Sequence, residues 1–305
     1  MEINSWNKLD FVGDIHANSK KLIALIEKLG YCKTLDSWKH PENRQLVILG
    51  DFINAGLDNK QTLSILHSLW KNNTALIIIG NHEYFLAWYY FKFGKNIFIS
   101  PKPALLKDYE SILSEFYKST DELCEYVEWL MKLPFYIEND KFRAVHAYWS
   151  NENIEQLKPF ENLFQLFKFF ETSKSKEKKL KNAVNETIEG LKLPLYVSCK
   201  MDKPIKYRIK WWQNIYSKPL PLSIMTHKPV KCPGVIVTPE LLPGFKYYAE
   251  TEKPIFFGHY WFQTLPYLLR NNASCLDFGA SKGGYLAAYR WNGEKELNAE
   301  NLVYV

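Results

Sequence analysis

Three apolar, strand-like runs of the sequence each lead into a glycine and then into side chains that can bind metal ions. The runs are Leu9–Val12, Leu46–Leu49 and Ala75–Ile79. The polar side chains that follow them are Asp14, His16, Asp51, Asn81 and His82. The carboxyl ends of parallel strands meet at one edge of a sheet, where ligands bind. Oxygen and imidazole ligands suit Mn²⁺, Fe²⁺ and Zn²⁺. The pattern therefore predicts a site for divalent metal ions at that edge.

The spacing within the motifs supports this prediction. Asp14 and His16 are two residues apart, so in an extended segment both side chains point to the same face and can bind one ion. Asp51 has two carboxylate oxygens and can bridge a pair of ions. The glycines allow the backbone to turn sharply close to the ions.

These motifs, GDIHA, GDFINAG and GNHE, resemble the three N-terminal signatures of the calcineurin-like metallophosphoesterases, usually written GDxHG, GDxxDRG and GNHE. Two later histidines that the family requires after strands are supplied by AVHA, at residues 144–147, and FFGH, at residues 256–259. The C-terminal CLDFGASKGGYLAAYRW is similar to the bacterial branch near the PPP serine/threonine phosphatases and the diadenosine tetraphosphate hydrolases. The resemblance extends from Asp10 to the C-terminus, with unmatched inserts between the motifs.

The resemblance implies an α/β fold in which two packed mixed β-sheets are flanked by helices, a four-layer αββα arrangement. We expect one domain over residues 1–305, with helical inserts at about 84–133 and 151–193. The insert begins with the aromatic run Trp88 to Phe91, for which two interpretations are open. The run could stack a nucleobase, or it could pack the insert onto the sheet, and packing is favoured.

By the same resemblance, two divalent ions are expected, manganese first, with iron, zinc or nickel as alternatives. The first ion would be held by Asp14, His16 and Asp51. The second would be held by Asp51, Asn81, His146 and His259. A metal-activated hydroxide would attack phosphorus, and His82 would protonate the departing alkoxide as general acid. Trp261 stands where some members have a second histidine, which implies ligation by the single His259 in that motif.

Three residues depart from the family pattern, of which Ala17, in place of the last Gly of GDxHG, is a mild change. Asn54 and Ala55 stand where GDxxDRG has Asp and Arg. The family's Asp orients the catalytic histidine, and Asn54 can accept a hydrogen bond but brings no charge. The family's Arg binds the substrate phosphate, and Ala55 cannot. The basic residues that could replace it are Arg208 and Lys210 in YRIKWW, together with Arg143, Lys228 and Arg290.

Two functions are compatible with these residues. The first is a hydrolase, a metal-dependent phosphoesterase acting on a phosphomonoester, a phosphoanhydride or a phosphodiester. Its substrate would be a phosphorylated small molecule, a nucleotide or a phosphoprotein. The alternative is a catalytically weak, metal-holding module that binds a nucleotide or a protein partner. The complete ligand set and His82 favour the hydrolase.

The composition limits the size of the core, the kind of substrate and the expected location of the protein. The chain has 305 residues, of which 47% are hydrophobic, enough for one sizeable core. Its net charge of +6 is a mild excess that fits an anionic substrate and does not by itself indicate nucleic-acid binding. The five scattered cysteines, with no CxxC pair, indicate reduced thiols. We see no signal peptide and no apolar run long enough to span a membrane, so a cytoplasmic location is expected.

Local patterns predict further elements. A helix should follow Asn18, and another should begin near Asp58. Segments 134–138 and 142–145 should pair around the Asn139–Asp140 turn. Strands of a second sheet are expected at 223–226, 234–238 and 255–258, and a closing hairpin is expected from 275–278 and 285–291. His67 is interpreted as a packing residue. His227 could be a sixth ligand or a substrate contact, and a role other than a ligand is favoured.

Overall fold

The computed structural model describes residues 8–98, 107–173, 177–196, 203–227, 229–232 and 234–305. Its first sheet has the strand order β14-β15-β1-β4-β5, and β16 also pairs with β15. These strands are β1 (Leu9–Val12), β4 (Gln45–Ile48), β5 (Ala75–Ile77), β14 (Asp277–Phe278), β15 (Tyr285–Trp291) and β16 (Leu302–Tyr304). β1, β4 and β5 are parallel, whereas β15 runs antiparallel to β1. The carboxyl ends of the three parallel strands therefore meet, as expected.

A second sheet has the order β13-β12-β7-β6. Its strands are β6 (Tyr136–Glu138), β7 (Arg143–Val145), β12 (Ile255–Phe257) and β13 (Ala273–Cys275). β12 is parallel to both β7 and β13, while β6 and β7 form the predicted antiparallel pair. Both sheets are therefore mixed. The ends of β7 and β12 deliver His146 and His259.

Alternate residues of the first sheet pack into two different cores. Phe11, Val47 and Leu76 point toward the second sheet and join its apolar cluster. Ile48 and Ile77 point to the other face, which the helices cover. Phe11 stacks on Phe256 of β12 with ring centroids 3.7 Å apart, which joins the two sheets directly. Successive side chains of a strand point to opposite faces of the sheet, so each strand contributes to an apolar layer on both faces.

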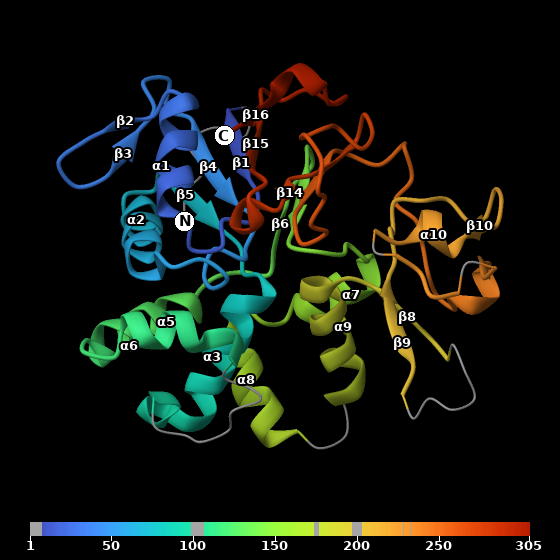
Figure 1. Ribbon diagram of the computed structural model, residues 1–305, viewed down its shortest axis with the longest axis horizontal. Coiled ribbons are helices and arrows are strands. Elements are labelled where there is room, and N and C mark those ends of the chain that lie inside the picture. Colours follow the sequence, from blue (N-terminus) through green and yellow to red (C-terminus); the bar gives the residue numbers. More distant parts are fainter. Residues whose placement is uncertain (1–7, 99–106, 174–176, 197–202, 228, 233) are drawn as a thin grey trace.

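Helices α1 (Ser19–Lys28) and α2 (Asn59–Lys71) pack on the outer face of the first sheet (Figure 1). The side chain of Asn18 caps α1 by accepting a hydrogen bond from the Lys21 backbone N–H, as its position predicted. α2 begins one residue after Asp58. The ring of His67 lies among Trp70, Tyr126 and Trp129, which confirms its packing role.

The helical segments between β5 and β6 and between β7 and β8 (Lys192–Leu195) form the lower part of the molecule in Figure 1. Their helices are α3 (Asn81–Phe93), α5 (Glu110–Glu115), α6 (Thr120–Leu130), α7 (Asn151–Leu157), α8 (Leu163–Thr172) and α9 (Glu177–Glu189). The aromatic run lies on α3, where Trp88 and Phe91 contact Phe167 of α8. Tyr89 and Tyr90 also pack against the same core. The run therefore packs, but these ring contacts join α3 to α8 rather than to the sheet.

The remaining elements are short. They are β2 (Cys32–Lys33), β3 (Trp38–Lys39), β8 (Lys192–Leu195), β9 (Ile205–Arg208), β10 (Leu220–Pro221), α10 (Leu222–Met225), β11 (Ile236–Val237) and the 3-10 turns η1 (Gly94–Phe98), η2 (Lys107–Tyr109), η3 (Pro239–Leu241), η4 (Ala280–Lys282) and η5 (Ala299–Asn301). Among the described residues, no helix is both long and apolar enough to cross a membrane.

Three local predictions were wrong. Segment 223–226 falls on helix α10 rather than on a strand. β11 lies within 234–238 but pairs with β10, outside the second sheet. Segment 275–278 is divided, because β13 ends at Cys275 in the second sheet and β14 begins at Asp277 in the first. Only β14 forms the closing hairpin with β15. Short apolar runs carry no signal that distinguishes one helical turn from a strand or assigns a strand to a sheet.

Candidate metal centre

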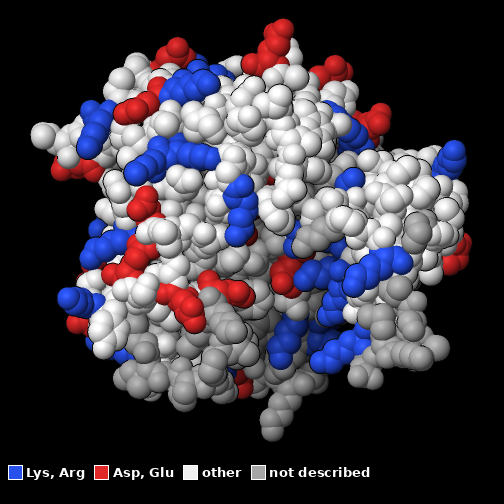
Figure 2. Space-filling view, in the orientation of Figure 1, with Lys and Arg blue, Asp and Glu red and all other residues white. Residues whose placement is uncertain are grey.

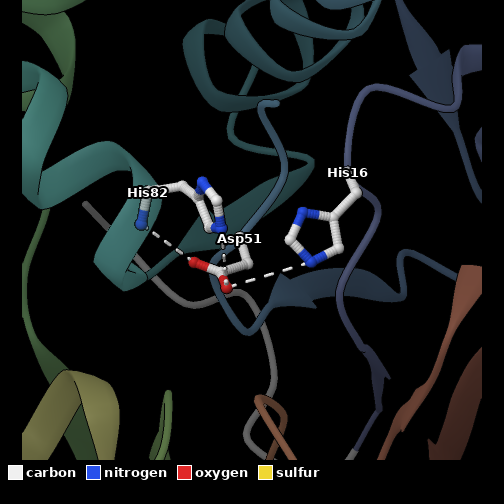
Figure 3. A group of neighbouring side chains, drawn as sticks. All are labelled: His16, Asp51 and His82. Carbon is white, nitrogen blue, oxygen red and sulfur yellow. Dashed lines mark hydrogen bonds and ion pairs between the residues drawn. The ribbon is translucent and has the colours of Figure 1, made fainter. Parts of the chain in front are cut away.

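Asp51 lies at the centre of the site, in the turn that follows β4. Its Oδ2 atom is 3.9 Å from Nε2 of His16 and 3.3 Å from Nε2 of His146. The same oxygen is 4.0 Å from Nε2 of His82 and 3.9 Å from Nδ1 of His259. Figure 3 shows His16 and His82 converging on the Asp51 carboxylate from two sides. One buried carboxylate is thus within 4.0 Å of four imidazole rings, three of which follow strands while the fourth, His82, lies in the first turn of helix α3.

These side chains divide into two groups that share Asp51. One group is His16, Asp51 and His82, and the other is Asp51, His146 and His259. Within each group, the nearest nitrogen and oxygen atoms all lie within 4.8 Å of one another. This is the arrangement that two cations bridged by one carboxylate require.

The Asn81 side chain completes the second group. One end of its carboxamide lies 3.0 Å from Nδ1 of His259 and 3.2 Å from Oδ2 of Asp51. Nε2 of His146 is 3.2 Å from that same Nδ1 atom. An amide nitrogen at this position would donate to both neighbours, whereas an amide oxygen there would share a cation with them. The donor types therefore fit a divalent ion among these four residues.

Asp14 follows β1 and lines the same cavity as His16, Asp51, His82 and His259. Its carboxylate accepts hydrogen bonds from the backbone N–H of His259 at 3.1 and 3.2 Å. Burial, followed by the negative charges of Asp277 and Asp51, raises the pKa of Asp14 well above its usual range. Asp14 does not belong to either close group of ligand atoms. A bound cation would offset the repulsion among these carboxylates.

The backbone at the site is held in an unusual conformation. Five non-glycine residues that line the cavity have a positive φ: His16, Asp51, Ala55, His259 and Trp261. Such conformations are uncommon outside glycine and cluster at functional sites, where the surrounding structure enforces them. Two glycines, Gly80 and Gly258, are needed for a different reason. A Cβ added to either one would overlap with the carboxylate of Asp51 or Asp14.

Burial alone would raise the pKa of Asp51. The His146 and His82 rings and the hydrogen bonds to Asp51 outweigh burial and hold its pKa well below the usual range. Burial and the Arg208 guanidinium lower the pKa of His259 well below its usual value. Asp51 is therefore an anion and His259 is a neutral imidazole near neutral pH. These are the protonation states in which both side chains bind a metal ion.

Glu83 holds two of the metal-binding loops together. Its fully buried carboxylate accepts hydrogen bonds from four backbone N–H groups. Three belong to Asp51, Phe52 and Ile53, at 2.9, 2.8 and 3.0 Å, and the fourth belongs to Gly80, at 3.0 Å. The last residue of the GNHE motif is therefore a structural anchor for the turn that carries Asp51.

We expect Glu83→Gln to destabilise the protein by about 3 kcal/mol. In the variant, the side-chain NH2 group of the glutamine would face backbone N–H groups that donate to the Glu83 carboxylate in the wild type, so these donors would lose their acceptor. Urea unfolding followed by circular dichroism measures this change. Glu110→Gln, at an exposed glutamate, is the control and should alter stability by less than about 0.5 kcal/mol. Equal stability of the two variants would contradict the anchoring role.

His82 begins helix α3 beside Asn54. The side-chain nitrogen Nδ2 of Asn54 is 3.2 Å from Nδ1 of His82. The backbone N–H of His82 donates to Asp51 Oδ1 at 3.1 Å, and the Tyr109 hydroxyl donates to the His82 carbonyl at 3.1 Å. Nδ2 of Asn54 can only donate, so Asn54 contacts Nδ1 of His82 as a donor and not as the acceptor that the sequence predicted. The catalytic role of each residue remains a prediction.

The structure distinguishes between the basic residues proposed to replace the missing arginine. Arg208 lines the same cavity, of about 280 Å³, as Asp14, His16, Asp51, Asn81, His82 and His259. Its guanidinium donates to the carbonyls of His259, at 2.7 Å, and Glu189, at 3.1 Å. Lys210, the other predicted substrate contact, does not line this cavity.

The other candidates do not line this cavity either. Arg143 pairs with Glu138 and Glu252. Arg290 pairs with the buried Asp10. Lys228 lies outside the described residues.

Sequence reasoning missed Lys282, which lines the cavity, and two carboxylates of the site. Asp277 lines the cavity and is buried, and its carboxylate accepts hydrogen bonds from the backbone N–H groups of Trp261, at 2.6 Å, and Gly279, at 3.2 Å. The other is Glu83, described above. Both lie inside motifs that carried the resemblance, yet neither motif indicated what the carboxylate contacts.

A sequence model of the calcineurin-like phosphoesterases matches residues 8–260, which is most of the chain. The protein therefore belongs to the calcineurin-like phosphoesterase family. This confirms the predicted fold class and the resemblance drawn from the five motifs.

Several curated proteins are similar to the chain. It is 36% identical over 75 residues to an asymmetrical bis(5'-nucleosyl)-tetraphosphatase PrpE of Oceanobacillus iheyensis, a stretch that covers 25% of this chain and 30% of that protein. It is 34% identical over 93 residues to the PrpE of a Geobacillus species, covering 30% of this chain and 37% of the relative. The chain thus spans about a third of the length of these relatives.

One match is longer. The chain is 26% identical over 311 aligned residues to the symmetrical bis(5'-nucleosyl)-tetraphosphatase of Buchnera aphidicola, covering 96% of this chain and 98% of that protein. Among solved structures, a cold-active protein tyrosine phosphatase superposes with a TM-score of 0.50 at 15% identity, covering 96% of this chain and 79% of the other. That likeness concerns the fold alone.

Proposed function

We propose that this protein is a hydrolase that cleaves phosphate esters or phosphoanhydrides with two divalent metal ions, manganese being the first candidate. The observation that carries the proposal is the buried Asp51 carboxylate, which two groups of imidazole ligands share. Two cations bound there would neutralise phosphate oxygens and lower the pKa of a water molecule. The match to the family supports the same chemistry.

Each ion would draw its ligands from several loops. Asp14, His16 and Asp51 would hold the first ion. The second ion would be held by Asp51, Asn81, His146 and His259. The contacts of Asp51 with His16, His146 and His259 support this division. The close group around His16 and Asp51 contains His82 and not Asp14, so His82 is an alternative ligand of the first ion.

His82 is proposed as the general acid that protonates the leaving group. Its ring is half-buried and lines the cavity, and its Nδ1 atom contacts Asn54. Asn54 thereby orients the ring and leaves Nε2 on the side of Asp51 and the reacting phosphate. An Asn brings no negative charge, so it stabilises a protonated imidazole less than an Asp would.

Arg208 is proposed to bind the substrate phosphate in place of the arginine that Ala55 replaces. We expect Arg208→Ala to raise KM by about tenfold, because one charge-assisted hydrogen bond to phosphate is lost. Steady-state kinetics with p-nitrophenyl phosphate measures the effect. Lys210→Ala is the control, because Lys210 lies outside the cavity. A larger effect at Lys210 than at Arg208 would reverse the assignment.

The alternative is a metal-holding module with weak catalysis, favoured by Asn54 and Ala55 at two positions of the catalytic signature. Metal content and turnover separate the two functions. We expect about two ions per chain after loading with Mn²⁺, together with metal-dependent hydrolysis of p-nitrophenyl phosphate. Bound metal without turnover for any of Mn²⁺, Ni²⁺, Mg²⁺ and Zn²⁺ would favour the module. No bound metal would contradict both.

A further inference from the structure

A second cavity, of about 360 Å³, adjoins the candidate metal centre. The two cavities share Trp261, Gly279 and Lys282. The second cavity is lined by apolar side chains, including Leu265 and Tyr285, and by the polar side chains of Gln263 and Thr264. It has no metal-ligand side chain in its lining, so it would accommodate a part of the substrate other than the reacting phosphate.

Trp261 is held in place as a wall between the two cavities. Its backbone has a φ of 46°, and its N–H donates to the buried carboxylate of Asp277 at 2.6 Å. Its indole packs against Gly279, where an added Cβ would lie 2.6 Å from the indole Nε1. Despite these restraints, the residue is 36% exposed. The structure thus fixes a large aromatic side chain at the mouth of the site and leaves part of it open to a ligand.

We propose that the second cavity binds the nucleoside end of the substrate, with its base stacked on Trp261. A planar ring on an exposed, fixed indole is a favourable contact for any base. Gln263 and Thr264 offer hydrogen-bonding groups to the edge of the base or to the sugar. The substrate of the proposed hydrolase is then a nucleotide. This inference rests on the proposed function for the identity of the reacting phosphate.

Lys282 favours a nucleotide over a simple aryl phosphate. It lines both cavities, so its ammonium group is suited to an anionic group lying between the metal centre and the stacked ring. In a phosphotyrosine, the ring is bonded directly through oxygen to the reacting phosphorus, and no second phosphate lies between them. A polyphosphate chain places further anionic groups at that position. The expected substrate is therefore a nucleoside polyphosphate.

The test compares two ligands that differ only in the base. Binding of AMP and of ribose 5-phosphate to the Mn²⁺-loaded protein is measured by calorimetry, which requires no turnover. We expect the wild type to bind AMP about tenfold more tightly than ribose 5-phosphate. In Trp261→Ala, the two ligands should bind with equal affinity. Trp261→Phe should retain most of the wild-type ratio, because the ring is conserved. Tyr117→Ala removes another exposed aromatic residue, one outside both cavities, and should leave the ratio unchanged.

Equal affinities for the two ligands in the wild type, or a ratio that survives in Trp261→Ala, would overturn the inference. Tighter binding of phosphotyrosine than of phosphoserine, with no preference for AMP, would overturn it in favour of an aryl phosphate. Failure of the proposed function is distinguishable from both, because it would appear as absence of metal-dependent turnover while the AMP ratio and its dependence on Trp261 persist.

Discussion

Replacing Asp51 by Asn should abolish most metal binding and lower turnover by more than about 100-fold. Oδ2 of Asp51 lies within 4.0 Å of a ring nitrogen of each of the four histidines. Both proposed ions would lose their shared anionic ligand, since an amide has one neutral oxygen where the carboxylate has two charged ones. No other residue lies in both groups of ligands.

The measurement combines metal analysis with thermal unfolding. A ligand that binds only the folded state raises the melting temperature, so Mn²⁺ should stabilise the wild type and have little effect on Asp51→Asn. Asp36→Asn, at an exposed aspartate, is the control and should behave as the wild type. A variant that keeps two ions and the stabilisation by Mn²⁺ would show that Asp51 is not the bridging ligand.

His82→Ala should lower turnover by about 10² to 10⁴-fold while both ions remain bound. Loss of a general acid matters most when the leaving group is a poor one. The decrease should therefore be larger with an alkyl phosphate than with p-nitrophenyl phosphate, whose leaving group departs without a proton.

This experiment also decides between the two roles that the geometry allows for His82. If the residue were a ligand of the first ion, the variant would lose metal, and its rate would decrease equally for both leaving groups. His40→Ala is the control, because that histidine lies outside the cavity and should leave both rates unchanged. Retained metal with equal decreases would mean that His82 orients the phosphate without transferring a proton.

Local sequence patterns determined most of what positions the site. The apolar runs before Asp14, Asp51 and Asn81 correctly located the three parallel strands. Each run is short and apolar, is followed by a glycine turn, and needs no distant residue to identify it. The histidines of the two later motifs also follow strands, and the structure brings both within 4.0 Å of Asp51.

The contacts between distant segments could not be obtained in this way. Arg208 and Lys210 are two residues apart in the sequence and equally basic, yet only Arg208 lines the cavity. Arg208 donates to the carbonyls of His259 and Glu189, and no local pattern records these contacts between distant segments. No local pattern predicts the contact of Asp277 either, because its side chain accepts a hydrogen bond from the backbone N–H of Trp261, sixteen residues earlier.

The sequence by itself determined the chemical types of the ligands and the family, because those depend on residue identity and on spacing along the chain. Only the tertiary structure decided that Glu83 anchors the Asp51 turn, and that Trp261 stands between two cavities. The Glu83 contact arises because β4 and β5 pair side by side, which brings the turn after β4 against the start of α3. The position of Trp261 depends on packing of the two sheets, because Trp261 follows β12 of one sheet and contacts Asp277 in β14 of the other.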